Sequence, residues 1–158
     1  FGLNNGTVPI VAYNFGARKG DRMKKTIKYS ICAAVGIMIA GMLLFQSIPD
    51  KLLLLFDASD EMLRLGVPAL RIISLAFPLA GFGIGAGSVF QALGYSVYSM
   101  VVSLIRQLVV LIPCAYVIGR VTGDVTGVWW AFFIAELVSL MVSALYLRRV
   151  NRNVIRTI

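Results

Sequence analysis

The sequence contains no histidine and only two cysteines, and charged residues make up just 14% of its 158 positions. Without histidine, most zinc sites, most catalytic triads and the usual proton shuttle near neutral pH are excluded. Cys32 and Cys114 each lie inside an apolar run without CxxC or metal-ligand spacing, so we expect two buried free thiols. With no nucleophile motif and no paired carboxylates within an apolar run, the sequence predicts no enzyme, no bound metal and no cofactor.

What remains is strongly apolar, with 59% hydrophobic residues and a mean hydropathy of +0.86. Soluble domains are about 45–50% apolar even when glycine is included. A water-soluble globule of this size has too small a core to bury so much apolar surface, and a disordered chain would be poor in apolar residues. The composition therefore predicts an integral membrane protein.

Several apolar runs are long enough to cross a bilayer, which takes about 20 helical residues. They are too long and too uniformly apolar for the strands of a barrel, and a helix satisfies all of its own backbone hydrogen bonds in hydrocarbon. The sequence thus predicts an all-α, polytopic transmembrane helix bundle. We expect spans at about 29–48, 66–93, 97–118 and 127–147, the end of an earlier helix at 1–16, and a basic tail at 148–158. This pattern predicts a fragment of a longer chain.

The basic residues predict how the bundle is oriented. The loop at 18–28 carries six lysines and arginines and the tail four, and four crossings place both on the same face of the membrane. By the positive-inside rule this face is cytoplasmic, so we expect the loop and the tail in the cytoplasm and the spans in the cytoplasmic membrane. Orientation thus accounts for ten of the fifteen basic residues, and no nucleic-acid partner is predicted.

Short strings of polar and small residues interrupt the apolar helices in a recognisable order. They are Pro9 to Ala17 (PIVAYNFGA) before the basic loop, Phe77-Pro78, Gln91 to Gly94 (QALG), Ser103 to Gln107 (SLIRQ), Gly127 to Ala131 (GVWWA) and Ala135-Glu136. Over essentially the whole chain these strings resemble the multidrug and toxic compound extrusion (MATE) transporters. The resemblance implies twelve helices in two six-helix lobes, with this chain as the later part of the second, C-terminal lobe.

The resemblance also implies a function. It predicts an antiporter in contact with membrane lipid that exports drugs and small organic cations by alternating access, with a proton or sodium as the coupling ion. The N-terminal lobe of the same protein would be a required partner. Some members carry an acid in the tenth helix, which corresponds here to about 65–93. No acid occurs there, which favours a coupling site in the first lobe.

Glu136 and Arg106 are the strongest candidate site residues. A carboxylate near the bilayer centre is costly, so it should face the interior and be paired. Both residues lie about ten residues into sequential antiparallel helices, or about 15 Å deep. We therefore expect the two side chains to meet, either as part of the substrate or ion pathway or as a structural ion pair. The amides of Gln91 and Gln107 are further pathway candidates, with hydrogen bonds between helices as the alternative.

One apolar run contains two overlapping GxxxG spacings, formed by Gly81, Gly83, Gly85 and Gly87. No strand or lysine accompanies them, so they do not form a phosphate-binding loop. Small residues at this spacing let helices approach closely. Together with Pro78 and Pro113, which kink helices, they also fit a flexible gate. Close packing and gating are both consistent with the sequence.

Two other functions fit the same helices. A lipid-linked substrate flippase of the broader superfamily would carry an anionic substrate and needs several basic residues in its cavity, whereas only Arg106 lies deep in a span. A non-transporting membrane assembly module is the other alternative, because a partial lobe has no second lobe to rock against. We expect the chain by itself not to transport.

Overall fold

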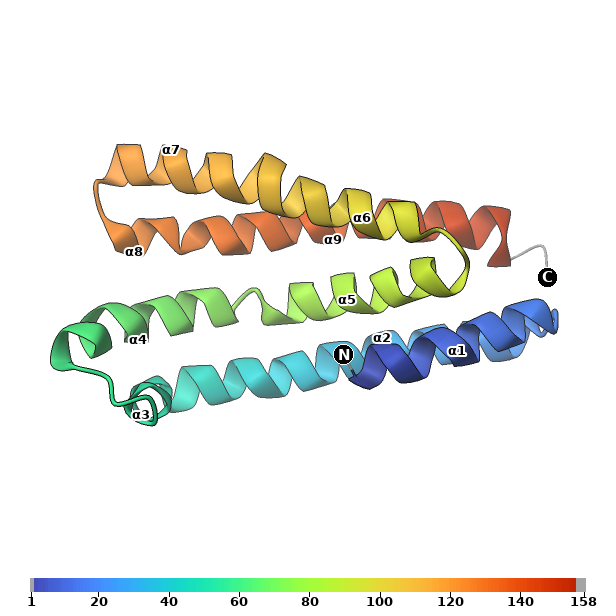
Figure 1. Cartoon of the computed structure of the whole chain (residues 1–158), viewed down its shortest axis with the longest axis horizontal. Helices are drawn as coiled ribbons and strands as arrows, with labels where there is room; N and C mark the ends of the chain where they lie inside the picture. The colour runs from blue at the N-terminus through green and yellow to red at the C-terminus, as the bar shows by residue number, and fades with distance from the viewer. Residues whose placement is uncertain (1, 156–158) are drawn as a thin grey trace.

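The computed structural model describes residues 2–155, and Figure 1 shows how their helices are arranged. These residues form helices and turns without any strand, so the all-α bundle is confirmed. The helices are α1 (Gly2–Gly16), α2 (Gly20–Ser47), α3 (Pro49–Leu54), α4 (Asp60–Ser74), α5 (Phe77–Ala92), α6 (Ser96–Leu104), the π-helix η1 (Ile105–Leu111), α7 (Ile112–Thr122), α8 (Val125–Val128) and α9 (Trp130–Asn153).

The long helices lie side by side, and successive ones run in opposite directions (Figure 1). The α1–α2 turn, the α5–α6 turn and the end of α9 lie at one end of the bundle, on the right in this view. At the other end lie α3, the start of α4 and the α7–α8 turn. Helix α5 packs against both α2 and α9, and the α6–η1–α7 stretch packs against α9.

The helices are long and apolar enough for several membrane crossings. Gly20–Ser47, Ser96–Thr122 and Val125–Asn153 each qualify alone, and α4 with α5 supplies a fourth crossing if this bent pair is one span. The axes of α4 and α5 differ by 51° at their break, so the expected run 66–93 is two helices. Pro78 lies in the first turn of α5, where its missing N–H favours the start of a new helix.

The basic segments belong to helices, contrary to the loop and tail expected from the sequence. Only residues 17–19 lie between α1 and α2, and α9 continues to Asn153. Lysine and arginine are good helix formers whose stems lie along apolar surface, so a helix continues past the membrane boundary through them. The side chains on these helix ends are Arg22, Lys24, Lys25, Lys28, Arg148, Arg149 and Arg152, while Arg156 lies outside the described residues.

Aromatic side chains hold the basic end of the bundle together. Phe90 is fully buried, and its ring packs edge-on against Tyr98 at 6.0 Å and Tyr146 at 6.3 Å. The two tyrosine rings stack at 4.4 Å, which joins α5, α6 and α9. Gly94, at a φ of +79°, makes the expected turn between α5 and α6.

The prediction of two buried thiols was wrong for Cys32. Its side chain is exposed on α2, and that of Cys114 is half-buried on α7. In a membrane bundle the outer face of a helix meets lipid, so an apolar run does not imply burial within the protein.

Candidate functional site

An ion pair joins the last two long helical stretches. Nη1 of Arg106, on η1, donates a hydrogen bond to Oε1 of Glu136, on α9, at 3.0 Å. The two side chains are 33% and 17% exposed, and theirs is the one salt bridge between side chains of residues 2–155. Oε2 of Glu136 is buried and has no hydrogen-bond partner within that range. The contact expected between these residues is therefore present, with one carboxylate oxygen left over.

The backbone around Arg106 is unusual. Arg106 and Gln107 lie in η1, seven residues of π-helix that continue α6 and lead into α7. Pro113 lies in the first turn of α7, where it cannot donate to the preceding turn. A π-helical turn is rare, shifts the register of the side chains that follow and often occurs at functional sites.

A cavity of about 170 Å³ lies beside the ion pair. Arg106 lines it, and its other walls come from α1, α5, α6 and α9. Most of the remaining lining is polar or glycine: Asn4, Gly83, Gly87, Gln91, Ser99, Ser103, Ser139 and Ser143, with Ile84 and Val102. We call this space the serine cavity.

The serine cavity has unsatisfied polar groups in its walls. Asn4 Oδ1 and Ser143 Oγ are buried and make no hydrogen bond to any residue from 2 to 155. Buried polar atoms are nearly always hydrogen-bonded to protein or water. The lining therefore suits a polar occupant, and a volume of about 170 Å³ is enough for several waters. Typical drug pockets begin at about 300 Å³, so the cavity is too small for a drug.

The four glycines of α5 face two different neighbours. A Cβ on Gly81 would lie 3.1 Å from the carbonyl oxygen of Ala34, and one on Gly85 would lie 2.9 Å from Cγ1 of Ile31. Both of these contacts are with α2. Gly83 and Gly87 instead line the serine cavity. One GxxxG spacing thus brings α5 close to α2, and the other leaves room for the cavity.

Of the remaining candidates, one lies at the cavity and the others lie apart from it. Gln91 lines it, whereas Gln107 is exposed and lines none of the pockets described here. Pro78 and Pro113 mark helix starts and do not line it either. No cluster of three His, Cys, Asp or Glu side chains suited to a metal ion occurs within 2–155.

The four serines that line the cavity were not predicted as site residues from the sequence. Ser139 and Ser143 follow Glu136 by three and seven positions on α9, and Ser99 and Ser103 are four apart across α6. Residues three, four and seven apart share one face of a helix, so each pair marks a polar stripe within an apolar span. That spacing is the signal that predicts the cavity.

Replacing Ser143 with alanine tests whether its hydroxyl contributes to the stability of the fold. Because the hydroxyl is buried without a partner, its removal should change the free energy of unfolding by less than about 0.5 kcal/mol. Thermal unfolding of the purified protein in detergent measures this. A loss of more than about 1 kcal/mol would show that the hydroxyl has a structural partner.

Comparison with known proteins places the chain in a family. Its residues 1–117 match the family model MatE. It is 31% identical over 135 residues to the multidrug export protein MepA of Staphylococcus aureus (strain bovine RF122 / ET3-1), covering 85% of this chain and 29% of that protein. For MepA of Staphylococcus haemolyticus (strain JCSC1435) the identity is 32% over 137 residues, covering 87% and 30%.

Solved structures agree with this match. The MATE multidrug transporter DinF-BH in complex with R6G superposes with a TM-score of 0.86 at 34% identity, covering 98% of this chain and 34% of that one. An inward-facing multidrug resistance MATE family transporter of the MOP superfamily has a TM-score of 0.86 at 23% identity, which shows the shared fold alone. The chain spans about 29–30% of the length of the MepA relatives. It is a multi-pass membrane protein and belongs to the MatE family.

Proposed function

We propose that this chain works within a transporter that exports drugs and small organic cations, coupled to the entry of protons or sodium ions. The observation that carries the proposal is the Arg106–Glu136 pair beside the serine cavity, inside the membrane-spanning part of a MatE chain. Intramembrane ionisable residues are costly and commonly mark ion or substrate pathways. The relatives named multidrug export protein support export as the activity.

Within this proposal the serine cavity serves a coupling ion and not the drug, which departs from the first-lobe coupling site that the sequence favours. Its volume of about 170 Å³ suits a small cation with water, and its hydroxyl and amide oxygens accept hydrogen bonds or coordinate a hard cation. Arg106 also lines the cavity, and the Glu136 carboxylate with which it pairs offsets its positive charge. The drug would lie in a larger space completed by the other lobe, because the chain spans only about 29–30% of the MepA relatives.

The ion pair would link cation binding to helix movement. A proton or sodium ion on Glu136 competes with Arg106 for the carboxylate, and so weakens the contact between η1 and α9. A ligand shifts a conformational equilibrium only through such differential contacts. The bend between α4 and α5, beside Pro78, and the change from π-helix to α-helix beside Pro113 would then be the places where these helices flex.

A cationic substrate fits better than an anionic one. Arg106 is the deep basic residue of the bundle, and its guanidinium is already paired with Glu136. A flippase for an anionic, lipid-linked substrate would need unpaired basic groups at that depth. We also propose that the basic end of the bundle faces the cytoplasm, in line with the positive-inside rule.

Vesicles containing the full-length transporter test the function. R6G, which is bound in the DinF-BH structure, is a suitable probe. We expect a proton or a sodium gradient, applied separately, to raise the rate of R6G transport at least about tenfold over vesicles without a gradient, which corresponds to about 1.4 kcal/mol of activation free energy. Transport that ignores both gradients would contradict cation coupling.

The chain alone is the matched control in the same vesicles. Because it has no other lobe to move against, we expect no gradient-driven R6G transport from it. A rate equal to that of the full-length transporter would overturn the need for a second lobe. Gradient-independent movement of an anionic lipid-linked substrate would favour the flippase.

A further inference from the structure

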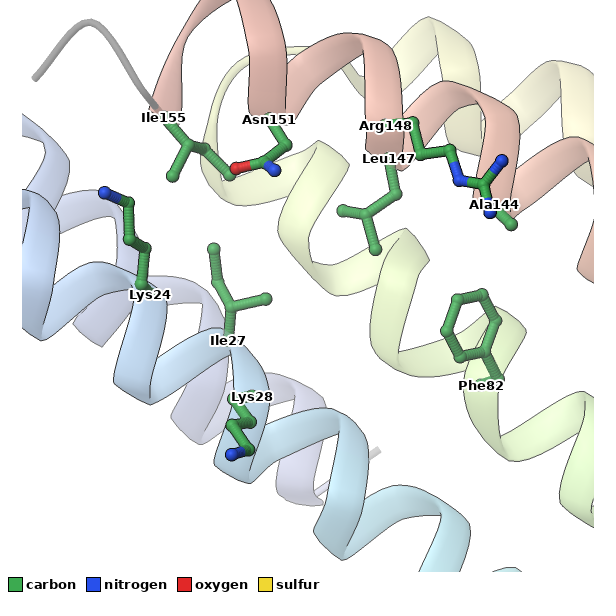
Figure 2. Close-up of a pocket in the computed structure, with 9 residues that line it drawn as sticks. All are labelled: Lys24, Ile27, Lys28, Phe82, Ala144, Leu147, Arg148, Asn151 and Ile155. Atoms are coloured by element: carbon green, nitrogen blue, oxygen red, sulfur yellow. The ribbon is translucent and has the colours of Figure 1, made fainter.

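A second and larger groove lies at the basic end of the bundle, between α2, α5 and α9 (Figure 2). Its volume is about 420 Å³. It is separate from the serine cavity and shares no lining residue with it. Its lining is Lys24, Ile27, Lys28, Phe82, Ala144, Leu147, Arg148, Asn151 and Ile155, and we call it the basic groove.

The polar part of the basic groove is positively charged. Lys24 and Lys28 come from α2 and Arg148 comes from α9, and no acidic residue lines the groove (Figure 2). None of these three cations forms a salt bridge with a carboxylate side chain within residues 2–155, where the single such pair is Arg106–Glu136. The groove therefore attracts anions and repels the organic cations proposed as substrates.

The rest of the groove is apolar and extends toward the membrane interior. Ile27, Leu147 and Phe82 project into the space between the three helices (Figure 2). Phe82 lies ten residues before the end of α5, which is about 15 Å of helix. The cations lie near the ends of their own helices, close to the expected membrane boundary at 29 and 147. One groove thus joins positive charge at headgroup depth to an apolar wall at acyl-chain depth.

We propose that the basic groove binds an anionic phospholipid. The charged ends of Lys24, Lys28 and Arg148 lie at separate places around the groove (Figure 2), so they attract the headgroup phosphate together without all contacting it at once, and an acyl chain lies along Ile27, Leu147 and Phe82. Basic pockets between membrane helices on the cytoplasmic side are suited to acidic headgroups, and the cytoplasmic leaflet carries anionic lipid. The inference rests on the proposed cytoplasmic position of the basic end but not on transport, so it holds or fails independently of the proposed export.

Native mass spectrometry of the full chain, released from detergent micelles, tests this binding. The two lipids compared are phosphatidylglycerol and phosphatidylcholine with identical acyl chains. We expect phosphatidylglycerol to bind at least about tenfold more tightly, and the triple variant Lys24→Gln/Lys28→Gln/Arg148→Gln to lose that preference. Inorganic phosphate at millimolar concentration should not displace the lipid, because it makes no contact with the apolar wall.

The matched control removes the same charge from the same helix ends. Lys25→Gln/Arg149→Gln/Arg152→Gln changes three residues that do not line the basic groove, and we expect it to keep the preference within about twofold. The variant Lys24→Arg/Lys28→Arg/Arg148→Lys should keep it too. Circular dichroism verifies that each variant is helical.

Three results would overturn the proposal. Equal losses in the two glutamine variants would show that general surface charge attracts the lipid. Displacement by inorganic phosphate would make the groove a site for the free anion. Tight phosphatidylglycerol binding that survives the Lys24→Gln/Lys28→Gln/Arg148→Gln change would place the lipid elsewhere and leave the groove to a protein segment.

Discussion

Replacing Arg106 with leucine is expected to destabilise the bundle by about 3 kcal/mol. The substitution would leave the Glu136 carboxylate, whose side chain is 17% exposed, without its cation. Breaking a buried pair by removing one partner typically costs about 3–5 kcal/mol. We expect the lower end of this range, because the Arg106 side chain is 33% exposed.

A double-mutant cycle tests this expectation. Glu136→Leu alone should also destabilise the protein, because it leaves the guanidinium of Arg106 without its carboxylate partner. Arg106→Leu/Glu136→Leu should approach wild-type stability, because replacing a buried pair with apolar side chains of similar volume is often neutral. Equilibrium unfolding of the four proteins in mixed micelles gives the interaction free energy. If the two single losses simply add, the pair makes no energetic contact.

Replacing Gly85 with leucine is the second change with a large expected effect. A Cβ at this position would lie 2.9 Å from Cγ1 and 3.2 Å from Cα of Ile31, so both side chain and backbone of α2 oppose it. Overpacking of a close contact typically costs about 1–3 kcal/mol. We expect a loss near the upper end of that range, seen as a lower thermal unfolding midpoint and a smaller folded fraction in size-exclusion chromatography.

Gly36→Leu is the control for this change. Gly36 lies on α2, and a Cβ added there would meet no atom within 4 Å beyond its chain neighbours and the backbone of its own helix, so the same substitution should be tolerated. Shortening the opposing side chain gives a second check, because Ile31→Ala should recover part of the loss caused by Gly85→Ala. Equal effects at Gly85 and Gly36 would contradict the close approach of α5 and α2.

The helices and the ion pair could be predicted from the sequence for the same physical reason. Hydrocarbon penalises every unpaired polar group, so long apolar runs must be helices and Glu136 must find a cation. Arg106 and Glu136 lie at about equal depth in sequential antiparallel helices. Arg106 is therefore the expected partner of Glu136. The Gly94 turn was also predictable, since only a glycine adopts its positive φ at no steric cost.

Other features depend on packing that one apolar run does not reveal. The π-helix at Ile105–Leu111 and the break after Ser74 leave the apolar character of their runs unchanged. A hydropathy profile therefore detects neither of them. The helical ends at Lys24 and Arg148 follow from helix propensity, which polarity does not report. The sequence does not distinguish the four glycines of α5, which occupy alternate positions. Only the structure shows that Gly81 and Gly85 face α2.

Cation-driven transport by the double variant Arg106→Leu/Glu136→Leu tests the central claim most directly. The measurement compares the full-length transporter with and without these two changes, in vesicles under the gradient that drives the wild-type protein. If the pair belongs to the coupling pathway, the variant folds with near wild-type stability and its rate of driven transport of an organic cation falls at least about tenfold, which corresponds to about 1.4 kcal/mol of activation free energy. A folded variant that transports at the wild-type rate would contradict the account and leave the pair a purely structural contact between η1 and α9.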